Sequence, residues 1–527
     1  MRRTCARVGW WTWVWLVAFG AFVPRAHAES GAFVMRAGRD TVVLERYTRE
    51  ATQLSGTTLF RPAGLRMDWA IVLGPDGGAR QMTTTVKPAT APGDAAPQQT
   101  AAFVWTGDSV FADVQPGQGG HFATSRGSLP YLNPSLAMLE QVVRTAQRRA
   151  AARVIVPVFM TAGGRTLDVE VTTPRADTVR VAFAGLTFVL AMDREGRLVS
   201  GSLPAQDVTF ERLPSLPEVL MGLAPPDYGA PAGAPYSADE VRVPMHGRFA
   251  LSGTLTRPKG KGPFPCVLLL TGSGPQDRDE AIPLVPGYRP FRQIADTLAR
   301  RGIASLRLDD RGTGASQGSF TGSTSADFAD DAEDALQWLT TAPGIDGKRL
   351  AVLGHSEGGL LAPMLVSRGV KVTALVLMAA PAWEGRRVIH EQNRYAAAGR
   401  YQGAALDSVL RAADRSVASA GIADPWLGYF LGHDPLPIAR QVRVPGLLLQ
   451  GETDRQVTAD QVDELAAAIR AGGNPSVTVH RLPETDHLFL PDPSGDPAGY
   501  SRLPTRAMPA RTLGILADWL ATQLRAR

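Results

Sequence analysis

The spacing of hydrophobic residues divides the chain into two regions. Between about residues 29 and 222, short segments alternate apolar and polar side chains and are broken by Gly, Pro and Asp, as in TLDVEVTTP. Such alternation predicts half-buried β-strands. One stretch, near Pro134–Ala152, instead repeats apolar residues at helical spacing: Leu136, Leu139, Val142, Val143 and Ala146. We therefore expect residues 29–222 to form a separate β-rich α+β domain, an antiparallel sheet partly wrapped on a helix.

The second region, 238–527, alternates strands with amphipathic helices, which predicts a mostly parallel sheet flanked by helices. One helix is expected to begin at Thr458 with a capping box to Gln461 and to stop at Gly472. Between the two regions, the Pro-, Gly- and Ala-rich residues 223–237 predict a linker. The predicted strands of the second region are Phe249–Thr256, Phe264–Thr271, Ala304–Leu308, Leu350–Leu353, Val372–Met378, Gly446–Leu449 and Val477–His480.

The first 28 residues have the pattern of a signal peptide. Three arginines precede an apolar run from Gly9 to Val23, and Ala26-His27-Ala28 follows as a cleavage site. The alternative is an uncleaved membrane anchor, although the apolar run is short for a bilayer span. We therefore expect residues 1–28 to be removed and the protein to be secreted or periplasmic.

Composition and charge narrow the class of protein further. The chain is 44% hydrophobic and 20% charged, as soluble globular proteins are. Loss of the signal peptide, with its four arginines and no acid, would lower the formal net charge from +5 to +1. Without a Lys/Arg cluster, we expect no nucleic-acid partner. Cys5 leaves with the signal, so Cys266 remains alone and neither an internal disulfide nor a cysteine metal site can form. We expect no metal, no cofactor and no membrane-spanning segment in the mature chain, and the sequence indicates no oligomeric state.

The pattern G-x-S-x-G occurs twice, at Gly354–Gly358 and at Gly314–Gly318. A nucleophile elbow needs a strand that runs into the serine and a helix that leaves directly after it. Ser356 follows the strand RLAVLG and precedes the helical GGLLAPMLVSRG, whereas Ser316 runs into the loop GSFTGSTS. We therefore predict Ser356 as the nucleophile and a structural role for Ser316.

A serine nucleophile needs a base and an acid that orients it, and in this fold they follow in the order Ser, acid, His. His487 lies in the loop PETDHLF, where it can reach over the sheet edge, whereas His480 lies within a predicted strand. Upstream, GLLLQGETDRQV offers Glu452 and Asp454, and the turn G-x-x-D favours Asp454. The predicted triad is therefore Ser356, Asp454 and His487.

An acyl-transfer site also needs hydrogen-bond donors for the oxyanion. We expect one from the backbone N–H of Glu357, directly after the nucleophile, and one from Ser273 in the Gly-rich loop TGSGPQDRD. That loop lacks the G-K-[ST] ending of a phosphate-binding loop. The glycines 312, 314 and 318 resemble a dinucleotide fingerprint only loosely, because no helix opens there.

A lid and its aromatic residues are the candidates for substrate contact. About sixty Ala-rich, helical residues, at about 382–440, separate two predicted strands and should form a lid over the serine. Its aromatic residues either line an apolar substrate pocket or pack the lid helices on each other: Trp383, Tyr395, Tyr401, Trp426, Tyr429 and Phe430. The acids Asp277, Asp279 and Glu280 could anchor a peptide terminus, but a solvated turn is the expectation.

Residues from about 238 to the end resemble the bacterial α/β-hydrolases grouped with esterase D, which include carboxylesterases and serine-aminopeptidase-like hydrolases. The matching pieces, in order, are GSGPQDRDE, RLDDRGTGAS, GHSEGG, HDPLPIARQVRVPGLLLQGETDRQV, ETDHLF and SGDPAGY. The resemblance implies the α/β-hydrolase fold and the same triad of Ser356, Asp454 and His487. Thr271 departs from the pattern, because many α/β-hydrolases carry His before the oxyanion Gly.

These observations predict a serine hydrolase without a cofactor. A carboxylesterase that cleaves short- to medium-chain acyl esters through an acyl-enzyme on Ser356 is the expected function, with a small-molecule ester as the partner. An exopeptidase or acyl-thioesterase on the same scaffold is the alternative. A noncatalytic envelope-binding protein is a third possibility, although such proteins usually lose a triad member.

Overall fold

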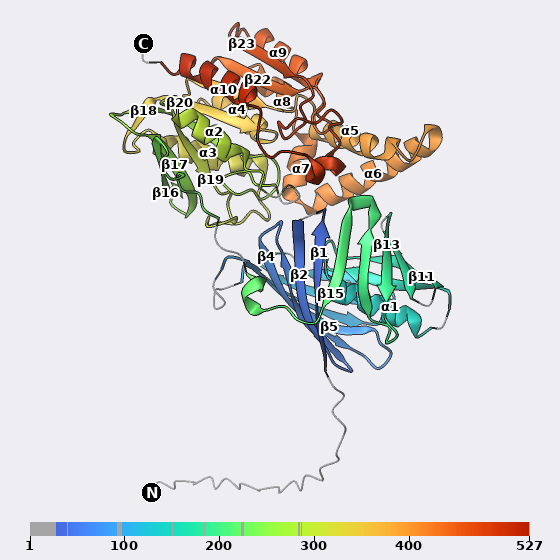
Figure 1. The fold of residues 1–527 in the computed structure, drawn as a ribbon. Coiled ribbons are helices and arrows are strands. Elements are labelled where there is room, and N and C mark those ends of the chain that lie inside the picture. Colours follow the sequence, from blue (N-terminus) through green and yellow to red (C-terminus); the bar gives the residue numbers. More distant parts are fainter. Residues whose placement is uncertain are drawn as a thin grey trace, which may run out of the picture.

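The strands of the protein form two separate sheets (Figure 1). The computed structural model describes residues 28–38, 40–91, 97–117, 119–149, 151–175, 177–183, 185–222, 226–282, 285 and 287–525. The expected signal peptide, apart from Ala28, lies outside these residues, as do residues 223–225 of the expected linker.

The N-terminal sheet contains fifteen strands and is almost entirely antiparallel; only β9 and β10 pair in parallel. Strands neighbouring in sequence are mostly neighbours in the sheet, except that β1 pairs with β15 and joins the two halves. The strands are β1 (Glu29–Ala37), β2 (Asp40–Arg49), β3 (Gln53–Phe60), β4 (Leu65–Leu73), β5 (Ala79–Pro88), β6 (Gln99–Thr106), β7 (Ser109–Gln115), β8 (Gly120–Ala123), β9 (Leu129–Tyr131), β10 (Arg153–Met160), β11 (Arg165–Arg175), β12 (Thr178–Phe183), β13 (Leu186–Met192), β14 (Leu198–Leu203) and β15 (Val208–Leu213).

This sheet curls around one helix, α1 (Leu136–Gln147), as the hydrophobic spacing predicts. Ser135 caps the helix by accepting the Met138 N–H at 3.1 Å. The fully buried Glu45 of β2 accepts two further N–H groups of the first turn, from Leu136 and Ala137. The apolar side chains of α1 therefore fill the core that the concave face of the sheet surrounds.

The second sheet has eight strands in the order β16-β17-β19-β18-β20-β21-β22-β23. Strands β16 and β17 are antiparallel to their neighbours and β18 to β23 pair in parallel, so the expected α/β-hydrolase sheet is confirmed. The strands are β16 (Tyr236–Met245), β17 (Phe249–Pro258), β18 (Phe264–Leu270), β19 (Ala304–Leu308), β20 (Ile345–His355), β21 (Ala374–Met378), β22 (Gly446–Gly451) and β23 (Val477–Leu482).

Helices cover both faces of the second sheet. One apolar core lies between the strands and α3 (Ser325–Leu339), α4 (Gly358–Ser367) and α9 (Gln461–Ala471). A second core lies between the other face and α2 (Pro290–Ala299) and α10 (Ala510–Gln523). All seven predicted strands are present, and β16 additionally begins at Tyr236, within the segment expected to be linker.

The start of α9 corrects one prediction. The helix begins at Gln461, with Asp460 rather than Thr458 at its N-terminal cap. Thr458 instead accepts a hydrogen bond from the Gln461 side chain at 3.3 Å, so the two residues contact each other without forming a capping box. The helix ends at Ala471 with Gly472 as its cap, as predicted.

Four helices between β21 and β22 form the insertion that the sequence predicts to be a lid: α5 (Gly385–Ala398), α6 (Gly403–Ala423), α7 (Pro425–Gly432) and α8 (Pro435–Ala439). Figure 1 shows α5 and α6 projecting from the side of the second sheet. Across the residues that the structure describes, no helix combines the length and apolarity needed to span a membrane.

Candidate active site

Ser356 lies in a strained turn between β20 and α4. Its φ is +52°, a conformation that L-residues avoid and that marks a position held by its surroundings. A side chain at Gly354 would put its Cβ 2.0 Å from the Gly358 carbonyl oxygen, and one at Gly358 would lie 2.2 Å from the Leu270 carbonyl oxygen. Both glycines of the motif are therefore required by close backbone contact, and the turn presents Ser356 at the end of the sheet.

The second G-x-S-x-G serine has a different environment. The Ser316 hydroxyl donates to the Asp309 carbonyl oxygen at 2.7 Å and accepts the Ser252 N–H at 2.9 Å. It therefore ties its loop to β17, which is a structural role.

Asp454 and His487 come together from the loops after β22 and β23. Their Oδ2 and Nδ1 atoms are 2.8 Å apart, and both residues are buried. The other carboxyl oxygen of Asp454 accepts the backbone N–H groups of Gln456 and Val457. The acid is thus fixed, and the imidazole keeps Nε2 as the nitrogen that can act as a base.

The competing residues lie elsewhere. Glu452 is exposed to solvent, two residues before the buried Asp454. His480 lies within β23, where it pairs with Leu449 of β22 in the ladder.

The expected oxyanion loop lies against the nucleophile. A Cβ on Gly272 would be 3.2 Å from Glu280 Oε1 and 3.3 Å from the Ser356 Cβ, so a side chain there would crowd the nucleophile. The Gly272 N–H is taken up by Glu280 Oε1 at 2.7 Å. Among the described residues, neither the Ser273 nor the Glu357 backbone N–H has an acceptor, so both can receive an incoming oxygen.

The side chain of Glu357 connects the elbow to the lid. Its Oε1 accepts the Ser325 hydroxyl at 2.6 Å and the indole N–H of Trp426 at 2.9 Å. Burial raises the pKa of Glu357 despite these hydrogen bonds. Trp426 in turn stacks on Phe430, with ring centroids 5.5 Å apart. Of the six aromatic candidates, Trp426 thus joins α7 to the nucleophile turn, and Phe430 packs on Trp426.

The other aromatic candidates contact side chains of the lid and its surroundings. Trp383 is 7% exposed, donates to Glu464 at 3.0 Å and is covered by the Arg387 guanidinium. Tyr395 is 36% exposed and lies under the guanidinium of Arg455. The partly buried Tyr429 packs on the core of the second sheet. These contacts fit the packing alternative, and their part in substrate binding stays a prediction.

The acidic turn after the oxyanion loop is not the solvated turn that we expected. Asp279 is fully buried and pairs with Arg307 and Arg289. Arg278, 1% exposed, makes a bidentate pair with Asp309. Burying charges is tolerated only when they are paired in this way, so the turn is a rigid support for the oxyanion loop.

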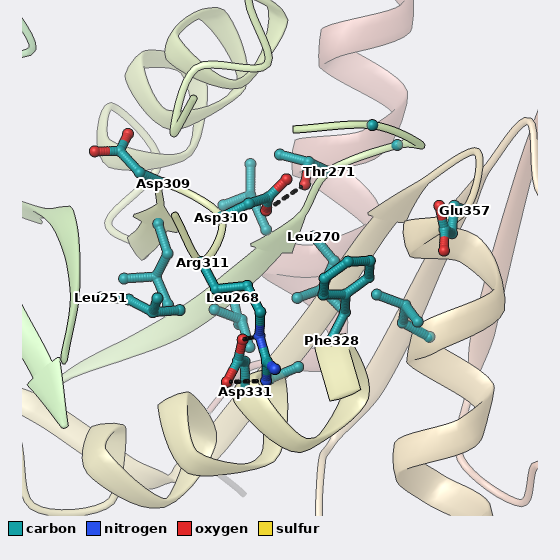
Figure 2. Close-up of a pocket in the computed structure, with 16 residues that line it drawn as sticks. Leu251, Leu268, Leu270, Thr271, Asp309, Asp310, Arg311, Phe328, Asp331 and Glu357 are labelled. Carbon is teal, nitrogen blue, oxygen red and sulfur yellow. Dashed lines mark hydrogen bonds and ion pairs between the residues drawn. The ribbon is translucent and has the colours of Figure 1, made fainter. Parts of the chain in front are cut away.

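A small cavity of about 50 Å³ lies behind this loop (Figure 2). Apolar side chains of β18, α3 and α4 form much of its wall, and Thr271, Asp310 and Glu357 supply polar groups. Thr271, the residue that departs from the family pattern, donates to Asp310 at 3.0 Å. Burial raises the pKa of Asp310 well above its usual range. Neither Ser356 nor His487 lines this cavity.

Sequence reasoning missed the roles of Glu280 and His355. Their side chains form a buried pair, with Glu280 Oε1 2.8 Å from His355 Nδ1. The signal in the sequence was a histidine after the apolar run Leu350–Leu353, directly before the nucleophile. In the described part of the chain, no group of His, Cys, Asp or Glu side chains is arranged to hold a metal ion.

Comparisons with known proteins found similarity to esterases and peptidases. The sequence model of the X-Pro dipeptidyl-peptidase (S15) family matches residues 247–423. Esterase EstD of Thermotoga maritima is 29% identical over 315 residues, which cover 58% of this chain and 69% of the relative. Dipeptidyl aminopeptidase BIII of Pseudoxanthomonas mexicana is 27% identical over 238 residues, which cover 44% of this chain and 31% of the relative.

The esterase Pf2001 of Pyrococcus furiosus matches with 20% identity and a TM-score of 0.38, over 50% of this chain and 89% of that protein. The sheet order, the serine elbow, the Asp–His pair and the relatedness to esterases and peptidases lead to one conclusion. The chain has the α/β-hydrolase fold, is similar to bacterial esterases and peptidases, and is a serine hydrolase.

Proposed function

We propose that the protein is a carboxylesterase that cleaves short- to medium-chain acyl esters through an acyl-enzyme on Ser356. The observation that carries the proposal is the buried Asp454–His487 pair, whose histidine contacts His355, the residue directly before the strained Ser356. The similarity to an esterase over 58% of the chain supports the ester as the substrate.

In the proposed reaction, His487 Nε2 takes the proton of the Ser356 hydroxyl as its oxygen attacks the ester carbonyl carbon. The N–H groups of Ser273 and Glu357 stabilise the oxyanion that forms. The C–O bond to the alcohol then breaks, and the alcohol leaves with the proton from His487. Water, deprotonated by His487, attacks the acyl-enzyme, releases the carboxylic acid and restores the serine.

An exopeptidase is the second candidate, because the matching family model and one relative are those of peptidases. Such an enzyme needs a charged group to hold a peptide terminus. The acidic turn does not offer one, since Asp279 is paired with arginines and Glu280 with His355, and Asp277 accepts the Tyr228 hydroxyl and two backbone N–H groups. An esterase does not need such a group, so the site supports an esterase better than an exopeptidase. An acyl-thioesterase would use the same triad, and a noncatalytic envelope-binding protein would not need one.

Location and substrate contacts are part of the same proposal. The pattern of residues 1–28 supports export to the periplasm or the medium. The lid over 382–440 would then select the acyl or alcohol group, with Trp383, Tyr395, Trp426, Tyr429 and Phe430 as the side chains to vary.

The test is a substrate panel on the purified protein and on Ser356→Ala. The panel contains p-nitrophenyl esters of increasing chain length, acyl-CoAs and aminoacyl-p-nitroanilides. We expect the highest kcat/KM on short or medium esters and no turnover by Ser356→Ala. A preference for anilides or for acyl-CoAs would replace the carboxylesterase by the corresponding alternative. Ester turnover that survives in Ser356→Ala would overturn the mechanism.

A further inference from the structure

Two buried side chains, Glu280 and His355, connect three of the four loops that carry the proposed catalytic groups; the fourth carries Asp454. Glu280 Oε1 accepts the Gly272 N–H at 2.7 Å and lies 2.8 Å from His355 Nδ1. On the other side of the ring, His355 Nε2 lies 2.9 Å from the carbonyl oxygen of His487. One hydrogen-bonded path therefore runs from the oxyanion loop, past the nucleophile turn, to the residue that supplies the base.

The partners of His355 determine where its protons are. A carbonyl oxygen only accepts hydrogen bonds, so Nε2 must carry a hydrogen. Nδ1 faces a carboxyl oxygen, which places a second proton between the ring and Glu280. Burial lowers the pKa of His355, but the charge and hydrogen bond of Glu280 outweigh it and raise the pKa overall. A ring that carries both protons can donate to Glu280 Oε1 and to the His487 carbonyl oxygen at once.

The position of Glu280 is maintained at a cost. Its φ is +55°, and the residue is 2% exposed. A non-glycine residue in this conformation costs on the order of 1 kcal/mol or more and persists only where its surroundings hold it. The neighbouring ion pairs of Arg278 and Asp279 provide that support on the same turn. The backbone is thus held in the conformation that brings the Glu280 carboxyl to Gly272 and His355.

We propose that Glu280 and His355 are positioning residues that hold the oxyanion loop and the His487 main chain in register with Ser356. This inference rests on the proposed acyl-transfer function and adds a second carboxylate–imidazole pair behind the triad. Because Gly272 precedes Ser273, a free Gly272 N–H would let the neighbouring oxyanion donor move. Donor misplacement weakens binding of the transition state more than binding of the substrate.

Three variants test this role. Glu280→Gln keeps the size of the side chain but loses the charge that holds the His355 imidazolium. A neutral ring that keeps its hydrogen on Nε2 needs a donor at Nδ1, whereas the Gly272 N–H needs an acceptor at the same position, so Gln cannot satisfy both. Glu280→Ala removes both contacts. The control is Glu45→Gln in the N-terminal domain, where another fully buried carboxylate accepts two backbone N–H groups far along the chain from the site.

Turnover is measured per serine that a fluorophosphonate labels, so that misfolded protein does not count. We expect Glu280→Gln to lower kcat roughly tenfold and Glu280→Ala roughly a hundredfold, with KM changed less than about threefold. Affinity for an alkyl trifluoromethyl ketone, whose serine adduct carries an oxyanion, should fall by the same factors. Glu45→Gln should lower the melting temperature and leave kcat unchanged.

The decisive variant is Glu280→Gln, because it is the one that preserves the packing. If it lowers the melting temperature while kcat and ketone affinity stay at wild-type values, Glu280 is only structural and the inference is wrong. A change in KM alone would overturn it as well. Failure of the underlying function looks different, since Ser356→Ala would then keep its turnover whatever the Glu280 variants do.

Discussion

The two sheets use buried charge for different purposes. In the N-terminal domain the fully buried Glu140 of α1 pairs with Arg49 of β2 and Arg212 of β15, and these contacts join the helix to the surrounding strands. In the second sheet, Asp454 and Glu280 lie at loops after parallel strands, each beside a histidine. Buried charge stabilises packing in one region and orients imidazole rings next to a strained serine in the other.

Topology explains this difference. Consecutive antiparallel strands bring together residues that are close in sequence, and the N-terminal sheet is built mostly from such pairs. Parallel strands need long crossovers, so their carboxyl ends collect loops from distant parts of the chain. Gly272, Ser356, Asp454 and His487 follow β18, β20, β22 and β23 in this way. We therefore expect the loops of the second sheet alone to supply the catalytic residues.

The largest effect should come from the nucleophile. Ser356→Ala is expected to lower kcat on a p-nitrophenyl ester by on the order of a millionfold, because the acyl-enzyme can no longer form. Ser316→Ala should keep kcat within about threefold, since its hydroxyl only joins its loop to β17. Steady-state kinetics of both variants check this contrast. Equal losses in the two variants would contradict the choice between the two motifs.

The next largest losses of kcat are expected from replacing the base and the acid. His487→Ala should be nearly as damaging as Ser356→Ala, and Asp454→Asn should cost on the order of 10⁴ in kcat, because the acid orients the ring without taking its proton. His480→Ala serves as the histidine control and should mainly change stability. If Glu452→Gln were crippling and Asp454→Asn mild, the acid would be misassigned.

A smaller effect is expected where the lid contacts the nucleophile turn. Trp426→Phe keeps the ring stacked on Phe430 but loses the hydrogen bond to Glu357. We expect faster amide hydrogen exchange in α7 and a change of a few-fold in the preference between short and medium acyl chains. Trp383→Phe, which loses a hydrogen bond to Glu464, is the matched control. Identical exchange in α7 of the two variants would show that the Glu357 contact does not hold the lid.

One buried acid should make stability depend on pH. Burial and the nearby Asp492 and Asp454 charges raise the pKa of Asp486 to about 7. Between about pH 3.8 and 7 the folded protein therefore binds a proton that the unfolded chain has released. As pH rises through this range, the residue lowers the free energy of unfolding by at most about 1.4 kcal/mol per pH unit. Asp486→Asn can still accept the Leu488 and Leu490 N–H groups but cannot ionise. The melting temperature of the variant should rise relative to that of the wild type between pH 5 and 8. A difference between the two that does not change with pH would contradict this prediction.

The smallest effect should come from removing the N-terminal domain. A variant that begins at residue 226 keeps Tyr228, which donates to Asp277 and lies over Arg278. Turnover of a small activated ester per labelled serine should stay within about threefold of the full chain. A hundredfold loss would mean that the N-terminal domain supplies part of the site. Unchanged turnover of small esters with an altered preference for bulky ones would indicate that it gates access.

Some of this architecture follows from local sequence and some does not. Hydrophobic spacing predicts the helix around Leu136 and the strands of the second sheet, because burial of one face leaves a period in the sequence. Strand β16 escaped detection, since its first residues, Tyr236 and Ser237, continue a Pro- and Gly-rich segment. The start of α9 was misplaced because Thr458 and Gln461 have capping-box spacing without the capping geometry.

The candidate site likewise contains residues that the sequence predicts and residues that it does not. Ser356 and its glycines can be recognised because the strained turn permits few residue types. The pairing of Glu280 with His355 joins residues 75 positions apart, and no periodicity reports such a contact. The acidic turn looked solvated because its arginine partners, Arg307 and Arg289, are contributed partly by a distant strand.

The central claim is that Ser356, activated by His487, is the nucleophile of the second sheet. The most direct measurement is the site of covalent labelling by a fluorophosphonate, found by mass spectrometry of the digested protein. We predict one adduct on the peptide that contains Ser356, with labelling strongly slowed in His487→Ala and unaffected in Ser316→Ala. An adduct on any other serine, or Ser356 labelling that proceeds at the wild-type rate in His487→Ala, would contradict the account.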